Sequence, residues 1–323
     1  MRVLLPTPID AVDPLEIYGT DIGPPPAGRP YVRVNMISSL DGAISVDGRS
    51  SLLGGDADRH LFFVLRSLAD VVLVGAGTAR TEGYGPVRLN QSLRRVRLER
   101  RQPTVPQLAV VTRSCDLDWS SSLFTEAEVR PIVITIKNAP ETCLRRARKV
   151  ADVVLAGDDS VDLGQALASL NERGVSKVLG EGGPSLNGYL AAGRFLDELC
   201  LTLSPRLAGG DGARVISGPS LPWPLKVEMA QVLEEDGFFF LRLRCLHSRR
   251  VVRRPDSVRA VADTSRTNMV SDVAENRAEQ SKDAGPIEPT TPVSDIEQEI
   301  DQASVDSFPA SDAPQWWVGR ARP

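Results

Sequence analysis

Short apolar runs alternate with amphipathic segments along most of the chain, and this pattern predicts a sheet covered by helices. Strand character is found over residues 31–37, 70–75, 107–112, 131–136, 152–156 and 175–179. Continuous apolar runs such as DVVLVG are typical of parallel strands buried on both faces. Between them, apolar positions at helical spacing predict helices over residues 58–68, 140–150, 162–173 and 184–192.

The end of the alternating region has a different pattern. A strand is predicted over residues 197–205, and two further strands, 226–234 and 238–244, flank Asp236-Gly237, a strong hairpin signal. Repeated strand–helix–strand units predict an α/β fold with a mostly parallel sheet flanked by helices, ending in a C-terminal antiparallel hairpin. In such sheets, ligands bind at the carboxyl ends of the strands.

Composition divides the chain into three parts. Residues 1–30 are a Pro-rich lead-in, residues 31–248 form the folded domain, and residues 249–323 are predicted to be a disordered acidic tail. Between Glu279 and Asp312 there are nine acidic residues and one basic residue, and such a segment buries too little apolar surface to fold. A short docking motif around Phe308, Trp316 and Trp317 is one interpretation of the tail; a solvated tail without a specific partner is the other.

Charge and residue counts exclude several classes of function. With 41% hydrophobic residues, 25% charged residues and a net charge of -4, the 323-residue chain is typical of a soluble protein without nucleic-acid or membrane partners. No signal peptide or membrane-length apolar run is visible. The four cysteines form no CxxC pair, so we expect reduced thiols in a cytoplasmic protein and no metal site. Only two histidines are present, which argues against a zinc-dependent hydrolase and against a Ser-His-Asp triad.

Two glycine clusters fall where predicted strands end. Gly75-Ala76-Gly77-Thr78 follows one strand directly, and Glu181-Gly182-Gly183 lies between another strand and a helix that Pro184 opens. Glycines there let backbone amides approach a phosphate, and the helix dipole favours an anion. Two such loops on neighbouring strands suit a dinucleotide, although tight turns are the alternative. The first loop is not the Rossmann fingerprint, because Arg80 holds the third glycine position.

The order of four segments resembles a known family. SSLDG, GAGT, EGGPSL and LDELCLTLSP follow one another as in the reductase domain of the bifunctional riboflavin-biosynthesis deaminase/reductase, a family of pyrimidine reductases with the dihydrofolate-reductase fold. The resemblance covers roughly residues 31–245, and the HxE and PCxxC motifs of the deaminase half are absent. It implies NADPH-dependent reduction of the ribosyl group of 5-amino-6-(5-phosphoribosylamino)uracil to ribityl, by hydride transfer to C1′, in an enzyme that is commonly a homodimer.

The resemblance and the glycine loops together assign site residues. Cofactor contacts are expected at Ile37, Gly75, Gly77, Thr78, Glu82, Thr112, Arg113, Ser114, Gly182, Gly183, Pro184, Ser185 and Leu186. Substrate contacts are expected at Ser50, Arg66, Arg88 and Glu181. At Arg113 a guanidinium suits the adenosine 2′-phosphate, because it pairs with phosphate in bidentate fashion. The catalytic candidates are Glu181 and Asp41, because a carboxylate near the ring-opened imine stabilises its cationic form; for Asp41-Gly42 a hairpin turn is the alternative.

Some positions depart from the family pattern. Ala43 stands where many members have Lys or Arg, Leu52 replaces an aromatic residue, and Glu82-Gly83-Tyr84-Gly85 replaces an acidic pair followed by Pro. Because these changes concern the substrate side, two alternatives stay open: a reductase of another heterocycle such as dihydrofolate or a dihydropterin, and an inactive nucleotide-binding or partner-docking protein. Phe238-Phe239-Phe240 is consistent with a dimer edge or with core packing.

Overall fold

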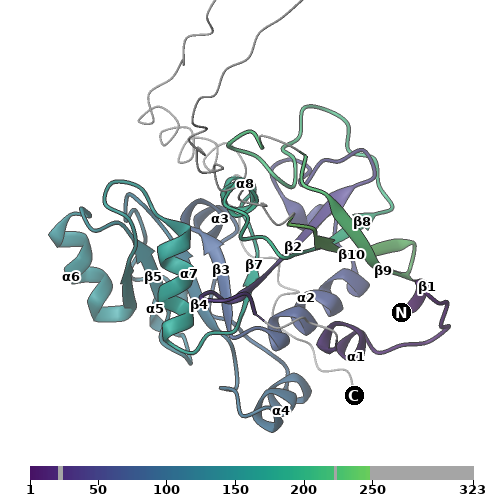
Figure 1. The fold of residues 1–323 in the computed structure, drawn as a ribbon, viewed down its shortest axis with the longest axis horizontal. Helices are drawn as coiled ribbons and strands as arrows, with labels where there is room; N and C mark the ends of the chain where they lie inside the picture. The colour runs from purple at the N-terminus through teal and green to yellow at the C-terminus, as the bar shows by residue number, and fades with distance from the viewer. Residues whose placement is uncertain (21–24, 222–223, 248–323) are drawn as a thin grey trace, which may run out of the picture.

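The protein is built on one ten-stranded mixed sheet (Figure 1). The computed structural model describes residues 1–20, 25–221 and 224–247. The strands are β1 (Arg2–Leu5), β2 (Tyr31–Ser39), β3 (Val71–Gly75), β4 (Gln107–Val111), β5 (Ile132–Thr135), β6 (Asp152–Leu155), β7 (Lys177–Gly180), β8 (Glu198–Ser204), β9 (Val227–Glu235) and β10 (Phe238–Cys245). Their order in the sheet is β1-β9-β10-β8-β2-β7-β3-β4-β5-β6. The predicted tail and its docking motif lie outside the described residues.

The direction of the strands divides the sheet into two parts. From β8 to β6 every neighbouring pair is parallel. The β9–β10 hairpin then adds antiparallel strands beside β8, and β1 pairs antiparallel with β9. The predicted fold class, a mostly parallel sheet with a C-terminal antiparallel hairpin, is confirmed.

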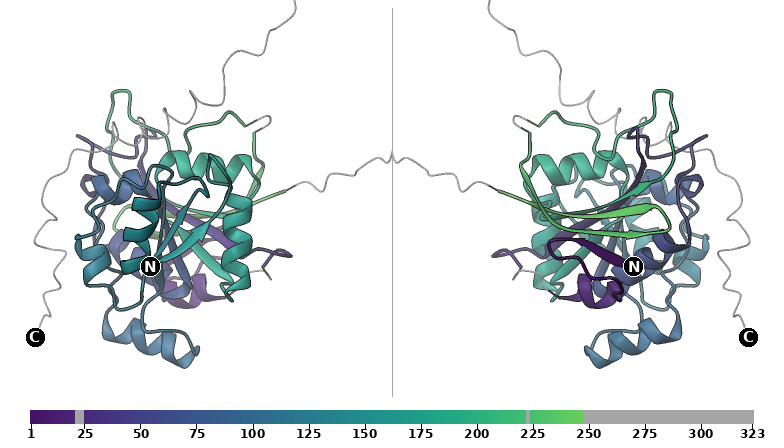
Figure 2. Two further views of the ribbon diagram at one scale, coloured as in Figure 1. Left: turned by 90° about the vertical axis from the view of Figure 1, so that its left-hand side faces the viewer. Right: turned by 90° about the vertical axis from the view of Figure 1, so that its right-hand side faces the viewer.

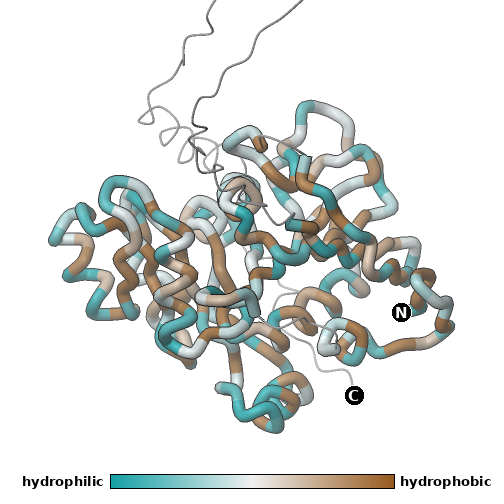
Figure 3. The backbone as a smooth tube through the Cα atoms, viewed as in Figure 1, coloured by the Kyte–Doolittle hydropathy of each residue, from teal (hydrophilic) through white to brown (hydrophobic). Residues whose placement is uncertain are grey.

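Helices cover both faces of the sheet, as the side views show (Figure 2). The helices are α1 (Pro14–Gly19), α2 (Asp56–Leu68), α3 (Ala76–Thr81), α4 (Gln91–Glu99), α5 (Ser122–Thr125), α6 (Glu141–Val150), α7 (Leu163–Glu172) and α8 (Pro184–Ala192), with a short 3-10 helix η1 (Ser50–Leu52). Apolar side chains of α1 and α2 pack with Val72, Val74 and Leu179 on one face, whereas α7 and α8 pack with Val71, Leu73 and others on the opposite face. Hydrophobic segments accordingly follow the central strands (Figure 3).

The first twenty residues belong to this fold, which the sequence pattern does not predict. Strand β1 pairs with β9, Val3 opposite Leu233, and both side chains are buried. Asp13 caps α1 by accepting a hydrogen bond from the Leu15 amide at 2.8 Å. The segment therefore extends the sheet and closes part of one face.

Tyr18 of α1 covers a buried group of charges. The guanidinium groups of Arg33 and Arg242 lie 5.7 Å and 5.8 Å from the Tyr18 ring centroid, in cation–π range. Both arginines pair with Glu198, at 2.6 Å and 3.1 Å. All three charged side chains are buried, so their mutual pairing replaces the water that they lose.

Two of the four cysteines are bonded to each other. Cys115, in the loop after β4, forms a disulfide with Cys143 of α6, and only Cys200 and Cys245 are free. The expectation of four reduced thiols is therefore wrong for this pair. The bonded residues are 28 positions apart, and they meet because β4 and β5 are adjacent parallel strands whose following segments lie side by side.

Candidate active site

The two predicted glycine loops meet at the carboxyl ends of β3 and β7. These strands are neighbours, and the Gly75 amide donates a hydrogen bond to the Gly182 carbonyl at 2.9 Å. The Glu181 amide donates to the Leu73 carbonyl at 2.9 Å, which continues the pairing one residue past β7. The segments GAGT and EGGP therefore form one continuous surface at this edge of the sheet.

Glycine is required in this surface for two local reasons. Gly182 has a φ of +90°, in the left-handed region that favours glycine. A Cβ atom on Gly183 would lie 2.5 Å from the Thr78 hydroxyl oxygen, so the backbone approaches α3 more closely than a side chain allows. Helix α8 starts at Pro184, and no side chain caps its first turn. The bare loop and the uncapped helix terminus can receive an anionic group such as a phosphate.

Glu181 is buried beside this loop and is held by two side chains. Arg66 of α2 donates from Nε to Oε1 at 2.7 Å and from Nη2 to Oε2 at 2.6 Å, and the Tyr84 hydroxyl donates to Oε2 at 3.0 Å. Arg66 is only 4% exposed and lies over the Phe62 ring at 4.1 Å. The structure thus brings Arg66 and Glu181 together as a bidentate pair, with the arginine within the protein rather than on its surface.

Phe62 and Tyr84 are site residues that sequence reasoning missed. Phe62 precedes Arg66 by one helical turn, so the amphipathic pattern of α2 contains a signal for their contact. For Tyr84 no comparable local signal exists, because its partner Glu181 is 97 positions away.

Asp41 connects two loops. Its carboxylate accepts hydrogen bonds from the Ser39 hydroxyl, from the Ala208 amide at 3.0 Å and from the Gly209 amide at 2.7 Å. These bonds, that from Ser39 above all, lower the pKa of Asp41 to about 2. Since both oxygens are occupied within the protein, the geometry supports a role in anchoring the turn after β2 to the loop after β8.

Ser50 and Glu82, expected on the substrate and cofactor sides respectively, contact each other. The Ser50 hydroxyl donates to Glu82 Oε1 at 2.9 Å, which joins η1 to the end of α3. Burial raises the pKa of Glu82. On β2, Ile37 packs at the margin of the core, and the neighbouring Met36 lies near the position of a Cβ on Gly182.

The segment expected to receive the adenosine end follows β4, the next strand after β3. Thr112 is buried and its hydroxyl accepts a hydrogen bond from the Cys115 amide at 3.0 Å. Arg113 and Ser114 are exposed, and Arg113 Nε donates to the Asp159 carbonyl at 2.9 Å. Arg88, expected on the substrate side, has a side chain that is 66% exposed and pairs with Glu126 at 2.8 Å.

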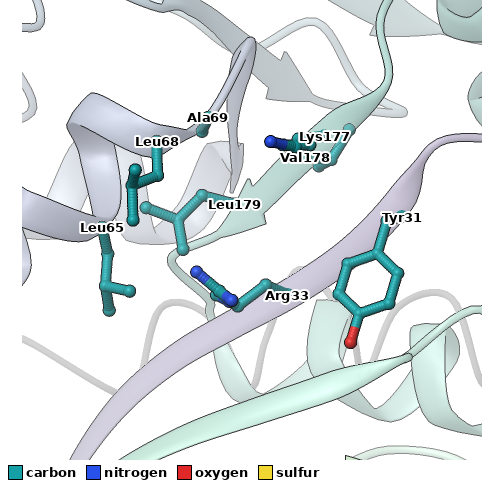
Figure 4. A pocket seen from close by; sticks show the side chains of 8 residues that line it. All are labelled: Tyr31, Arg33, Leu65, Leu68, Ala69, Lys177, Val178 and Leu179. Atoms are coloured by element: carbon teal, nitrogen blue, oxygen red, sulfur yellow. The ribbon is translucent and has the colours of Figure 1, made fainter. Parts of the chain in front are cut away.

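A small cavity lies away from this edge of the sheet, between β2, β7 and the end of α2. Figure 4 shows its lining side chains, which come from β2, the end of α2, and β7: Tyr31, Arg33, Leu65, Leu68, Ala69, Lys177, Val178 and Leu179. It lies toward the amino-terminal ends of β2 and β7, whereas ligands of such sheets bind at the carboxyl ends. Among the described residues, no three His, Cys, Asp or Glu side chains gather to hold a metal ion, and no described helix is long and apolar enough to cross a membrane.

The fold and this edge of the sheet define an α/β protein with a glycine-rich, uncapped helix terminus and a buried, paired carboxylate at its parallel strand ends. The sequence model of the RibD C-terminal domain matches residues 30–253, and the chain belongs to that family.

Several known proteins are similar to the chain. It is 30% identical over 209 residues to the 2,5-diamino-6-ribosylamino-4(3H)-pyrimidinone 5′-phosphate reductase of Archaeoglobus fulgidus, covering 64% of this chain and 95% of that protein. The protein of the same name from Aquifex aeolicus is 29% identical, over 59% and 83% of the two chains. The crystal structure of a pyrimidine reductase-like protein from Corynebacterium diphtheriae superposes with a TM-score of 0.61 at 28% identity, covering 68% of this chain and 92% of that one.

Proposed function

We propose that this protein is an NADPH-dependent reductase of riboflavin biosynthesis that converts the ribosyl side chain of 5-amino-6-(5-phosphoribosylamino)uracil to ribityl. The observation that carries the proposal is the joined surface of GAGT and EGGP with the buried Glu181 at its side, in a chain of this family. The names of the similar reductases support a phosphorylated ribosylaminopyrimidine as the substrate.

The residues at the strand ends fit a dinucleotide. Gly182 and Gly183, together with the first turn of α8, would hold the diphosphate, because amides and a helix terminus favour anions. Thr78 of α3 lies against the same loop, and Arg113 beside Ser114 would receive the 2′-phosphate that distinguishes NADPH from NADH. When bound, NADPH supplies the hydride that reduces C1′ of the substrate.

The chain's own residues provide orientation and electrostatics. Arg66 fixes the Glu181 carboxylate through two hydrogen bonds, so its charge is held in place before substrate binds. A preorganised carboxylate stabilises the positive charge of the substrate imine without reorganisation during the reaction. Correct placement of two reactants can itself account for ~7–11 kcal/mol of a barrier. No histidine acid or base is required.

We also propose that the protein is a cytoplasmic homodimer. Leu199, Leu201 and Leu203 of β8 lie opposite Leu243, Leu241 and Phe239 of β10, so six apolar side chains share one face of the sheet. Each of the six is at least partly exposed, whereas Glu198, Cys200 and Arg242 on the opposite face are buried. An apolar face of this kind is stabilised when a second copy covers it.

The test is NADPH oxidation by the purified full-length chain. We expect turnover with 5-amino-6-(5-phosphoribosylamino)uracil, assayed beside the 2,5-diamino-pyrimidinone phosphate named for the relatives and beside dihydrofolate. NADH replaces NADPH in a control, where lower activity is expected. Oxidation of NADPH with dihydrofolate but with neither pyrimidine would refute the proposed substrate, and absence of NADPH binding in calorimetry would refute the reductase.

A further inference from the structure

Tyr84 occupies a short turn that joins the two sides of the candidate active site. It lies three residues after α3, which carries Thr78, and its amide donates to the Ala79 carbonyl at 2.9 Å. Gly83, with a φ of +60°, makes the turn possible. The side chain then reaches Glu181, one residue past the end of the neighbouring strand β7.

The two carboxylate oxygens of Glu181 accept different numbers of hydrogen bonds. A carboxylate oxygen accepts about two hydrogen bonds. Oε2 receives Arg66 Nη2 and the Tyr84 hydroxyl and is therefore filled. Within the part of the chain that the structure describes, Oε1 receives only Arg66 Nε. Among the described residues, one acceptor position of this buried carboxylate thus has no donor, and it belongs to Oε1.

The Tyr84 hydroxyl is held in its protonated form, in which it can act as a hydrogen-bond donor. Burial, together with the negative charge of Glu181, raises the pKa of Tyr84 well above its usual value. The hydroxyl stays protonated at physiological pH and its proton points to Oε2, so it is committed to holding the carboxylate rather than to transferring a proton. The ring also lies 5.8 Å from the Arg66 guanidinium, on which Phe62 packs at 4.1 Å.

We propose that Tyr84 is a positioning residue that fills Oε2 of Glu181 and so presents Oε1 to the substrate. The proposal rests on the proposed function, because it assumes that Glu181 meets a cationic sugar intermediate. The substrate group that Oε1 would accept from is a hydrogen-bond donor of the ring-opened ribosylamine, either its N–H or a sugar hydroxyl.

The test is Tyr84→Phe in the full-length chain, which removes one oxygen atom and keeps the ring. We expect kcat/KM for the ribosylaminopyrimidine phosphate to fall about tenfold, the scale of one hydrogen bond to a charged group, while the Kd for NADPH changes less than about twofold. Tyr31→Phe is the matched control: the Tyr31 hydroxyl donates to Oε2 of another buried glutamate, Glu198, at 3.1 Å, and this variant should keep wild-type kinetics.

A double-mutant cycle with Glu181→Gln separates positioning from general destabilisation. If Tyr84 acts through Glu181, Tyr84→Phe costs less than about twofold in kcat/KM once Glu181 is replaced, and the two losses of Tm are not additive. Additive effects on both quantities, or an NADPH Kd that rises by the same factor as kcat/KM falls, would overturn the proposal. If wild-type protein reduces no pyrimidine, the proposed function fails, whereas the Tm cycle in the same four proteins still shows whether Tyr84 holds Glu181.

Discussion

At the scale of single residues, carboxylates at this edge of the sheet have different tasks. Glu181 is buried and paired with a cation, whereas Asp41 is exposed and bonded to loop amides. The sequence indicates both as candidates, because each stands beside a glycine after a strand. Their partners come from α2 and from the loop after β8, segments far away along the chain, and only the folded structure distinguishes the two roles.

Asp41 predicts a pH-dependent contribution to stability. Its pKa of about 2 lies below the reference value of 3.8, so its stabilising effect is complete above the reference value and is lost as pH falls toward about 2. We expect Asp41→Asn to have a lower Tm than wild type at neutral pH. The difference should shrink below about pH 4 and nearly vanish near pH 2. Thermal unfolding of both proteins across this range measures it, and a gap that is constant with pH would contradict the assigned hydrogen bonds.

At the scale of elements, the strand-to-helix junctions determine where a ligand can approach. The glycine clusters are predictable because a run of apolar residues ends at each of them. That β3 and β7 are adjacent is not predictable from local pattern, because about a hundred residues separate them.

Gly182→Val tests the anion cradle. A valine at a φ of +90° is strained, and its Cβ would lie 3.4 Å from the Met36 sulfur, so the loop amides would have to shift from the arrangement that suits a diphosphate. We expect NADPH affinity, followed by fluorescence titration, to fall at least tenfold. Gly174→Val is the control, since Gly174 has a φ of +85° with open space around it and lies in a turn after α7. Equal loss of affinity in both variants would show that strain, rather than the cradle, is responsible.

The Cys115–Cys143 disulfide predicts a redox-dependent stability. It closes a loop across 28 positions, and cross-links of this size stabilise folded domains by about 3 kcal/mol. We expect the Cys115→Ser, Cys143→Ser double variant to lose about this free energy of unfolding in urea titrations. A reducing agent should destabilise wild type similarly and leave the double variant unchanged. Sensitivity of the double variant to the reductant would contradict this assignment.

Two of the elements that sequence reasoning missed, α3 and β1, share a physical cause. Helix α3 is only six residues long and begins in a glycine-rich segment, so its composition indicates a loop. Strand β1 is four residues long and is followed by Pro6, and its buried residue Val3 has its partner more than two hundred positions away. The long apolar strands and amphipathic helices were predictable because their own pattern specifies them. The short elements α3 and β1 are instead stabilised by their contacts with the rest of the sheet.

At the scale of the whole molecule, the apolar face of β8 and β10 predicts self-association. We expect Leu241→Glu to yield monomers in analytical ultracentrifugation, because a charge cannot be buried between two leucine faces. Leu98→Glu, on an exposed position of α4, should leave the association state unchanged. Wild-type protein that sediments as a monomer would refute the homodimer.

The position of Tyr18 has a practical consequence for anyone who trims the chain to the part that the family model matches. A recombinant version starting at residue 30, where the family match begins, lacks the aromatic lid over Arg33, Arg242 and Glu198 and also lacks the last strand of the sheet. Water would then reach three charged side chains that are buried in the full-length protein. The backbone N–H and C=O groups of β9 that pair with β1 would be exposed to neighbouring molecules. Such a fragment should precipitate during purification, even though every residue of the candidate active site is intact.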